Sequence, residues 1–286
     1  MATVHALTAG HLTLPEKFFI SPLDDPTTRS TVPSLSFLIQ HTTPTRTTRI
    51  IFDLGIRKNI NHYPEPIYKH STTRQPLSGD PDPVACLAKG KLTPDDIDLV
   101  IFSHLHWDHV GTPSDYPRST YVIGPGAKAL ISDERMLRNG SHCHFERGLL
   151  PDTRTIELPL DTLFPNTMDI FRDGSVYIVS APGHLDGHIN LLVRLESGKY
   201  VYLAGDACHD RRLLSGEKDI ATWTDPAYES ICCIHVDRLA AEKTLAVIRE
   251  TMSNTTELGD VEVIFAHDAD WERGAWRRER FFPGEL

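Results

Sequence analysis

Ser103-His104-Leu105-His106-Trp107-Asp108-His109 places three histidines and an aspartate within six consecutive positions. The apolar run 97–102 comes directly before it and predicts a buried strand that ends where the polar cluster begins. Alternate side chains of an extended chain point to the same side, so His104 and His106 can bind one ion. Asp108 and His109 fall on the following turn, where they can bind a second ion. Histidine and carboxylate at this density are typical ligands of zinc or a similar divalent ion.

Three more candidate ligands follow later apolar runs along the chain. His184 comes shortly after the run 175–180, Asp206 shortly after 199–204, and His267 directly after 261–266. Ligands at strand ends are held by a rigid scaffold while their tips stay open to a substrate. Because these positions are far apart in the sequence, we expect the chain to fold back on itself and bring them together.

In this order, the H-x-H-x-D-H motif and the three later residues resemble the signature of the metallo-β-lactamase superfamily, over roughly residues 1 to 275. The resemblance implies a four-layer αβ/βα sandwich of the α/β (α+β) class, with two sheets face to face, helices outside and metals at one edge. The pattern of the chain agrees with this architecture. It includes an amphipathic helix over 237–252, with Leu239, Leu245 and Ile248 on its apolar side.

The resemblance also implies a ligand set for two divalent metal ions. The first ion would be bound by His104, His106 and His184, the second by Asp108, His109 and His267, and Asp206 would bridge both. Zinc suits these nitrogen and oxygen ligands, with iron or manganese as alternatives. Asp53 would support the site by orienting a ligating histidine, or it caps a turn. His188 is expected beside the ligands, and Cys208 is expected to pack in the core.

The activity that the resemblance implies is hydrolysis of a carbonyl substrate by a hydroxide shared between the two ions. Asp108 would carry the proton to the leaving group. The motifs look most similar to those of N-acyl homoserine lactone hydrolases, which commonly have a tyrosine three residues after the bridging aspartate. His209 stands at that position here, and we expect it to donate a hydrogen bond to the substrate carbonyl. The sequence thus predicts a lactone hydrolase. A lactam hydrolase acting on a xenobiotic or natural product, or a thioesterase similar to glyoxalase II, is the alternative.

Two irregular inserts, 56–82 and 132–165, are expected to shape the pocket. The first is long, polar and interrupted by prolines, and we interpret it as a wall or lid of the site. The second contains His142 and His144, which form another H-x-H without a preceding strand. Surface or pocket-lining positions suit these two histidines better than a role as ligands.

The composition narrows the classes of partner. A formal net charge of −10 argues against a nucleic-acid partner, since binders of the phosphate backbone normally show clustered Lys and Arg. The first seven residues are typical of a strand and not of a signal peptide. No apolar stretch is long enough to predict a membrane span. The partner expected is a small-molecule substrate, and the chain is expected to be a monomer or a homodimer.

The five cysteines are odd in number and show no C-x-x-C pattern, which predicts reduced thiols and a cytoplasmic protein. The 286 residues contain no linker, repeat or low-complexity tract. Together with the dispersed ligands, this predicts one domain over residues 1–286.

Overall fold

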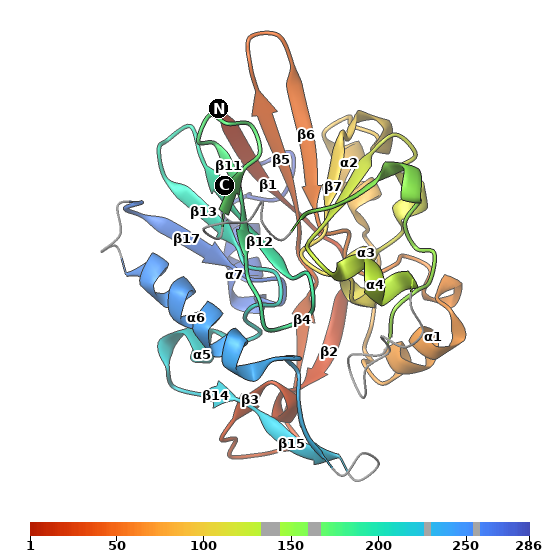
Figure 1. Cartoon of the computed structure of the whole chain (residues 1–286), viewed down its shortest axis with the longest axis vertical. Helices are drawn as coiled ribbons and strands as arrows, with labels where there is room; N and C mark the ends of the chain where they lie inside the picture. The colour runs from red at the N-terminus through yellow and green to blue at the C-terminus, as the bar shows by residue number, and fades with distance from the viewer. Residues whose placement is uncertain (133–143, 160–166, 226–229, 254–257) are drawn as a thin grey trace.

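The computed structural model describes residues 1–132, 144–159, 167–225, 230–253 and 258–286, and two β-sheets form its centre (Figure 1). The first sheet has the strand order β1 (Ala2–Leu7), β5 (Ser36–Thr42), β6 (Thr47–Phe52), β7 (Leu99–Ile101), β8 (Thr120–Ile123) and β9 (Thr155–Glu157). The second has the order β10 (Thr167–Asp169), β11 (Val176–Ser180), β12 (Ile189–Arg194), β13 (Tyr200–Leu203) and β17 (Val261–Ile264). Pairing is parallel from β6 to β9 and between β13 and β17, and antiparallel elsewhere in these two sheets.

Side-chain alternation along the strands builds one core between the sheets and another beneath the helices. Phe37 and Phe52 belong to the buried cluster that also contains Leu191 of the second sheet. Their neighbours Leu38 and Ile51 belong to the cluster formed with the outer helices. Successive residues of a strand point to opposite faces, so the central strands are buried on both sides.

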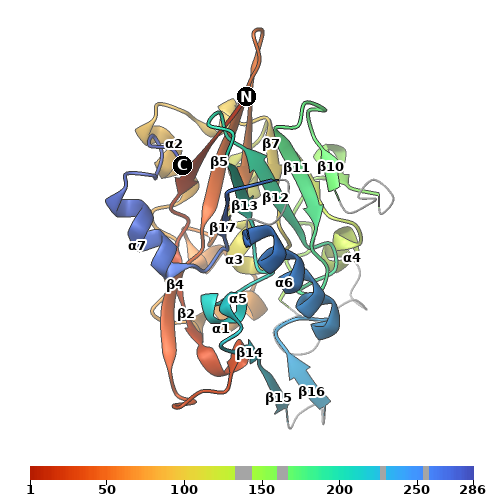
Figure 2. The ribbon, with the colours of Figure 1, turned by 90° about the vertical axis from the view of Figure 1, so that its left-hand side faces the viewer.

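Helices cover the outer faces of both sheets (Figure 2). The first sheet carries α2 (Pro83–Lys89), α3 (Trp107–Val110) and α4 (Ala127–Ser132), and the second carries α5 (Arg211–Ser215) and α6 (Arg238–Met252). Trp271 and Ala275 of α7 (Ala269–Arg277) extend the cluster between the sheets. This is the αβ/βα sandwich that the sequence predicted.

Three small two-stranded sheets and α1 (Glu65–Thr72) surround one end of the sandwich (Figure 1). The pairs are β2 (His11–Pro15) with β4 (Arg29–Pro33), β3 (Ile20–Ser21) with β14 (Asp219–Ile220), and β15 (Thr222–Asp225) with β16 (Ser230–Cys233). The described ranges also contain short 3₁₀ helices between the larger elements: η1 (Glu16–Phe18), η2 (Ile60–His62), η3 (Pro94–Asp96), η4 (Pro113–Asp115) and η7 (Asp152–Arg154). None of the helices in the described ranges is long and apolar enough to cross a membrane.

The inserts are more regular than the sequence predicted. Segment 56–82 contains η2 and α1, and α1 buries only Ile67 and Ser71, too few residues to produce a visible apolar period. Segment 132–165 contains β9, which pairs with β8. Much of this second insert, including His142, lies outside the described residues.

Leu239 does not lie on the buried side of α6 as predicted. Its side chain is 70% exposed, whereas Ala241, Leu245 and Ile248 are buried. Two residues correspond to about 200° around a helix, so Leu239 points away from the stripe that Ala241 begins. The helix begins at a cap provided by Asp237, whose side chain accepts a hydrogen bond from the backbone N–H of Ala240 at 3.0 Å.

Candidate metal centre

The candidate ligands follow β7, β11, β13 and β17, and they lie on loops except for Asp108 and His109, which lie in α3. The parallel pairing of β13 with β17 brings the loop of Asp206 beside that of His267. A backbone hydrogen bond from Ile189 to Ser103 joins the loop after β7 to the second sheet. The two sheets therefore contribute ligands to one shared edge.

The first group of ligands is fully buried and consists of His104, His106, His184 and Asp206. The Nε2 atoms of His104 and His184 lie 2.9 Å and 3.1 Å from Nδ1 of His106. Oδ2 of Asp206 lies 3.5 Å from Nε2 of His184 and 3.8 Å from Nε2 of His104. One ligand atom from each residue lies within 4.8 Å of all the others, so the four can surround one ion.

The second group contains Asp108, His109 and His267. Nε2 of His267 lies 3.7 Å from Oδ2 of Asp108. Oδ1 of Asp206 lies 3.2 Å from Nε2 of His109 and 3.3 Å from Nε2 of His267. The two oxygens of Asp206 thus face different ligand groups, which is the arrangement that a bridging carboxylate requires.

Hydrogen bonds on the far side of the rings orient the histidines. Nδ1 of His109 donates to Oδ2 of Asp53 at 3.0 Å, and the Ser103 backbone N–H and hydroxyl each donate to Asp53 at 2.7 Å. The Ser103 hydroxyl also lies 3.0 Å from Nδ1 of His104. Nδ1 of His267 donates to the Pro33 carbonyl at 2.7 Å. These contacts turn Nε2 of each ring inward, so Asp53 has the orienting role and not only that of a turn residue.

Gly205 and His188 hold the loop of Asp206 in place. Gly205 has φ +50°, and a Cβ there would lie 2.7 Å from Cβ of Ser103, so glycine is required at this close approach. Nε2 of His188 accepts a hydrogen bond from the Asp206 backbone N–H at 3.1 Å. His188 therefore lies beside the ligands, as expected.

Burial and neighbouring charges shift the pKa values of the ligands in different directions. Burial lowers the pKa values of His104 and His184 well below the usual range. Neighbouring histidines act in the same direction, chiefly His109 on His104 and His104 on His184. Burial alone would raise the pKa of Asp206, but His109, His267 and His209 hold it well below its ordinary value. Although burial opposes it, the charge of Asp206 raises the pKa of His109 well above its usual range and that of His267 above 6.5, so these two rings must release a proton when they bind a metal ion.

The donor set fits divalent metal ions. Nε2 of His104 and Nε2 of His184 each lie 2.9–3.1 Å from Nδ1 of His106. The lone pairs of these ring nitrogens therefore meet in a buried space. A cation between them satisfies these lone pairs without a proton on each ring. Imidazole nitrogen and carboxylate oxygen suit zinc, iron and manganese alike.

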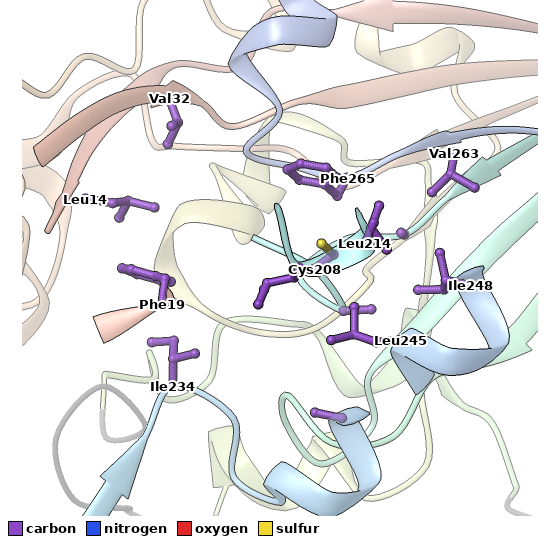
Figure 3. Close-up of a cluster of buried hydrophobic side chains, with 14 of the residues drawn as sticks. Leu14, Phe19, Val32, Cys208, Leu214, Ile234, Leu245, Ile248, Val263 and Phe265 are labelled. Atoms are coloured by element: carbon purple, nitrogen blue, oxygen red, sulfur yellow. The ribbon is translucent and has the colours of Figure 1, made fainter. Parts of the chain in front are cut away.

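His209 points into the same centre. Its Nε2 lies 3.0 Å from Oδ2 of Asp206, and its ring stacks on that of His267 with centroids 5.8 Å apart. Cys208, by contrast, lies in an apolar cluster with Phe19 and Leu245 (Figure 3). Burial raises the pKa of its thiol to about 12, so Cys208 packs and does not provide a thiolate.

A cavity leads to the ligands. Leu12, Leu14, Phe19 and Ile234 form its apolar wall, and His70, Arg74 and Trp107 line it together with the ligands. His70 and Arg74 come from segment 56–82, so this insert forms a wall of the site. Leu14, Phe19 and Ile234 appear together at one side of the cluster drawn in Figure 3.

The sequence analysis did not single out Arg74, Ser103 or His235. His235 is buried, with its ring centroid 5.2 Å from that of His184 and 5.4 Å from that of His209. It follows β16 just as the ligands follow their strands, and that signal could have identified it. Ser103 directly precedes His104 in the motif. Nothing in the sequence around Arg74 marks it as a cavity residue.

A family model for the metallo-beta-lactamase superfamily matches residues 29–284. The chain belongs to the metallo-β-lactamase superfamily. Among solved structures of similar fold is an N-acyl homoserine lactone hydrolase with N-hexanoyl-L-homoserine bound at its metal centre. The match has a TM-score of 0.71, 19% identity, and coverage of 99% of this chain and 98% of the other.

Two curated relatives within the metallo-β-lactamase superfamily bear on the substrate. The γ-lactamase FDB1 of Fusarium pseudograminearum (strain CS3096) is 30% identical over 68% of this chain and 50% of its own length. The N-acyl homoserine lactonase AttM of Azorhizobium caulinodans is 26% identical over 70% of this chain and 68% of its own length. The chain spans between about a third and a half of the length of the first curated relatives that it matches.

Proposed function

We propose that this chain is a binuclear metallohydrolase that opens small cyclic esters. The observation that carries the proposal is the position of Asp206, whose Oδ2 faces His104 and His184 while its Oδ1 faces His109 and His267. His104, His106 and His184 would hold one ion, Asp108, His109 and His267 would hold the other, and Asp206 would be shared between them. Zinc suits this set, and iron or manganese are the alternatives.

Two divalent ions bound here would supply a nucleophile from water at neutral pH and polarise the substrate carbonyl. Asp108 lines the cavity and would carry the proton to the leaving oxygen. The His209 ring presents Nε2 at the centre, where its hydrogen bond to Asp206 can be replaced by one to the substrate carbonyl. Trp107 and the apolar wall exclude water from the part of the substrate ring that lies away from the scissile carbonyl.

The similarity to AttM, a lactonase, supports a lactone as substrate. A lactam is the second candidate, and the 30% identity to the γ-lactamase FDB1 favours it. Esters and amides present the same carbonyl to the same nucleophile. They differ in the leaving atom, because an amide nitrogen must be protonated before it departs, which places a greater demand on Asp108.

The experiment combines metal analysis with a substrate panel. We expect two divalent ions per chain by mass spectrometry, and hydrolysis of lactones, lactams or both in preference to thioesters. A His106→Ala variant should lose one ion and nearly all turnover. His62→Ala, which removes an exposed histidine of the first insert, is the matched control and should retain both. One ion or none in the wild type, or turnover confined to thioesters, would contradict the proposal.

A further inference from the structure

Arg74 is a guanidinium inside the candidate active site that forms no ion pair with any side chain in the described part of the chain. It is only 9% exposed and lines the same cavity as Asp108, His209 and the apolar wall. Within the described ranges, its side chain makes no ion pair or hydrogen bond. Its backbone is fully used, because its N–H donates to the Ser71 carbonyl and its carbonyl accepts from the Thr13 N–H, each at 2.9 Å.

A buried, unpaired arginine is costly to the fold. Burial is the main influence on the pKa of Arg74 and lowers it, and the nearby charge of Arg29 acts in the same direction. Asp108 opposes this effect, but Asp108 belongs to the second ligand group. Since arginine remains protonated in proteins, the cavity holds a permanent positive charge. Such a group is retained at this cost when a ligand supplies the missing anion.

The surroundings of Arg74 favour an anion and not another cation. The neighbouring His70 stays neutral, because burial together with His144 and Arg74 lowers its pKa to about 3. Arg74 and the metal-binding groups line the same cavity. A small molecule within this cavity can therefore place one end at the ligands and another at the guanidinium. Arginine binds carboxylates through paired N–H donors of matching geometry.

We propose that the natural substrate is a cyclic ester or amide that carries a carboxylate, and that Arg74 binds this carboxylate while the scissile carbonyl lies at the metal centre. The proposal rests on the hydrolase function proposed above and adds the charge of the substrate to it. Leu12, Leu14, Phe19 and Ile234 then contact the uncharged body of the molecule. Arg74 acts as a specificity residue that touches the substrate away from the reacting carbonyl.

The test compares phthalide, a benzene-fused lactone, with its four ring-carboxylate isomers and their neutral methyl esters. For at least one isomer, we expect the wild type to prefer the carboxylate to its methyl ester by about tenfold or more in kcat/KM. Arg74→Met should lose this preference and still hydrolyse neutral phthalide. Arg74→Lys should keep part of it. Arg118→Met removes an exposed arginine paired with Asp95 and should keep the full preference.

Two further measurements separate this proposal from the proposed function. Indanone carboxylates, ketone analogues that cannot be hydrolysed, should bind the metal-loaded wild type at least about tenfold more tightly than Arg74→Met by calorimetry. Arg74→Met should melt at the wild-type temperature or above, because it removes an unpaired buried charge. Equal carboxylate preference and equal calorimetric affinity in wild type and Arg74→Met would overturn the role of Arg74. Failure to hydrolyse any lactone or lactam, with the difference in affinity intact, would overturn only the hydrolase function.

Discussion

Replacing Asp53 by asparagine should weaken the second metal site without disturbing the fold. Asp53 is 1% exposed and accepts hydrogen bonds from His109 and from both the N–H and the hydroxyl of Ser103. An asparagine oxygen can still accept from the Ser103 N–H, and the Ser103 hydroxyl can rotate to accept from the new amide. Asparagine also tolerates the positive φ of 60° at this position.

The ring of His109 is where the change acts. The asparagine NH₂ would face Nδ1 of His109, which lies 3.0 Å from Oδ2 of Asp53 in the wild type. Nδ1 would then have to accept a hydrogen bond, so the proton of the neutral ring would move to Nε2, the atom that faces Asp206. That tautomer cannot bind an ion through Nε2. Loss of such an orienting contact typically lowers metal affinity about 10- to 100-fold, or about 1.4–2.7 kcal/mol.

Chelator competition followed by metal analysis measures the effect. One of the two ions should dissociate from Asp53→Asn at a chelator concentration that leaves the wild type loaded, and turnover should fall with it. Asp169→Asn is the matched control, because this carboxylate accepts from the backbone of Phe171, Arg172 and Gly174 and belongs to none of the ligand groups. Unchanged affinity for both ions in Asp53→Asn would refute the tautomer argument.

Three other predictions concern catalysis, pH and packing. His209→Phe should lower kcat about 100-fold by removing the donor to the carbonyl, with metal content unchanged; an unaltered kcat would exclude that contact. The hydrogen bond to Glu272 raises the pKa of His11 above 6.5, so its stabilising effect is complete below pH 6.5 and is lost as the pH rises through the raised value. Urea unfolding should therefore show the advantage of wild type over His11→Gln shrinking above pH 6.5, and a constant difference would contradict it. Ile248→Ala should cost about 2–5 kcal/mol of unfolding free energy, because this side chain is fully buried. Leu239→Ala, at an exposed position of the same helix, should stay within about 0.5 kcal/mol of wild type, and equal losses at both positions would contradict the orientation of α6.

The fold and the ligand positions could be predicted because each signal is local. The runs before His104, Asp206 and His267 are apolar on both faces of the strand, and a polar ligand follows each within a few residues. The periodicity of α6 was also recognisable, but its orientation was not. Leu239 and Ala241 compete for the buried stripe, and only packing against the second sheet decides between them.

The cavity wall could not be predicted for a different physical reason. Helix α1 buries only Ile67 and Ser71, and its position depends on contacts with distant residues. Tyr63 at its start donates its hydroxyl to the Trp107 carbonyl at 2.9 Å, which ties the insert to the metal-binding motif. Contacts of this kind join residues more than forty positions apart, so the pattern of residues within segment 56–82 does not predict where the segment lies.

The candidate metal ligands and the residues of the cavity wall come from different parts of the fold. The candidate metal ligands follow strands of both sheets, so their positions depend on the packing of the whole sandwich. Phe19, Arg74 and Ile234 come from three separate peripheral segments, and each reaches the cavity from outside the two sheets. A substitution in one of these segments can change the charge or shape of the cavity and leave the ligand geometry intact. The motif therefore indicates the class of reaction, and we expect the choice of substrate to depend on residues such as Arg74 that carry no motif.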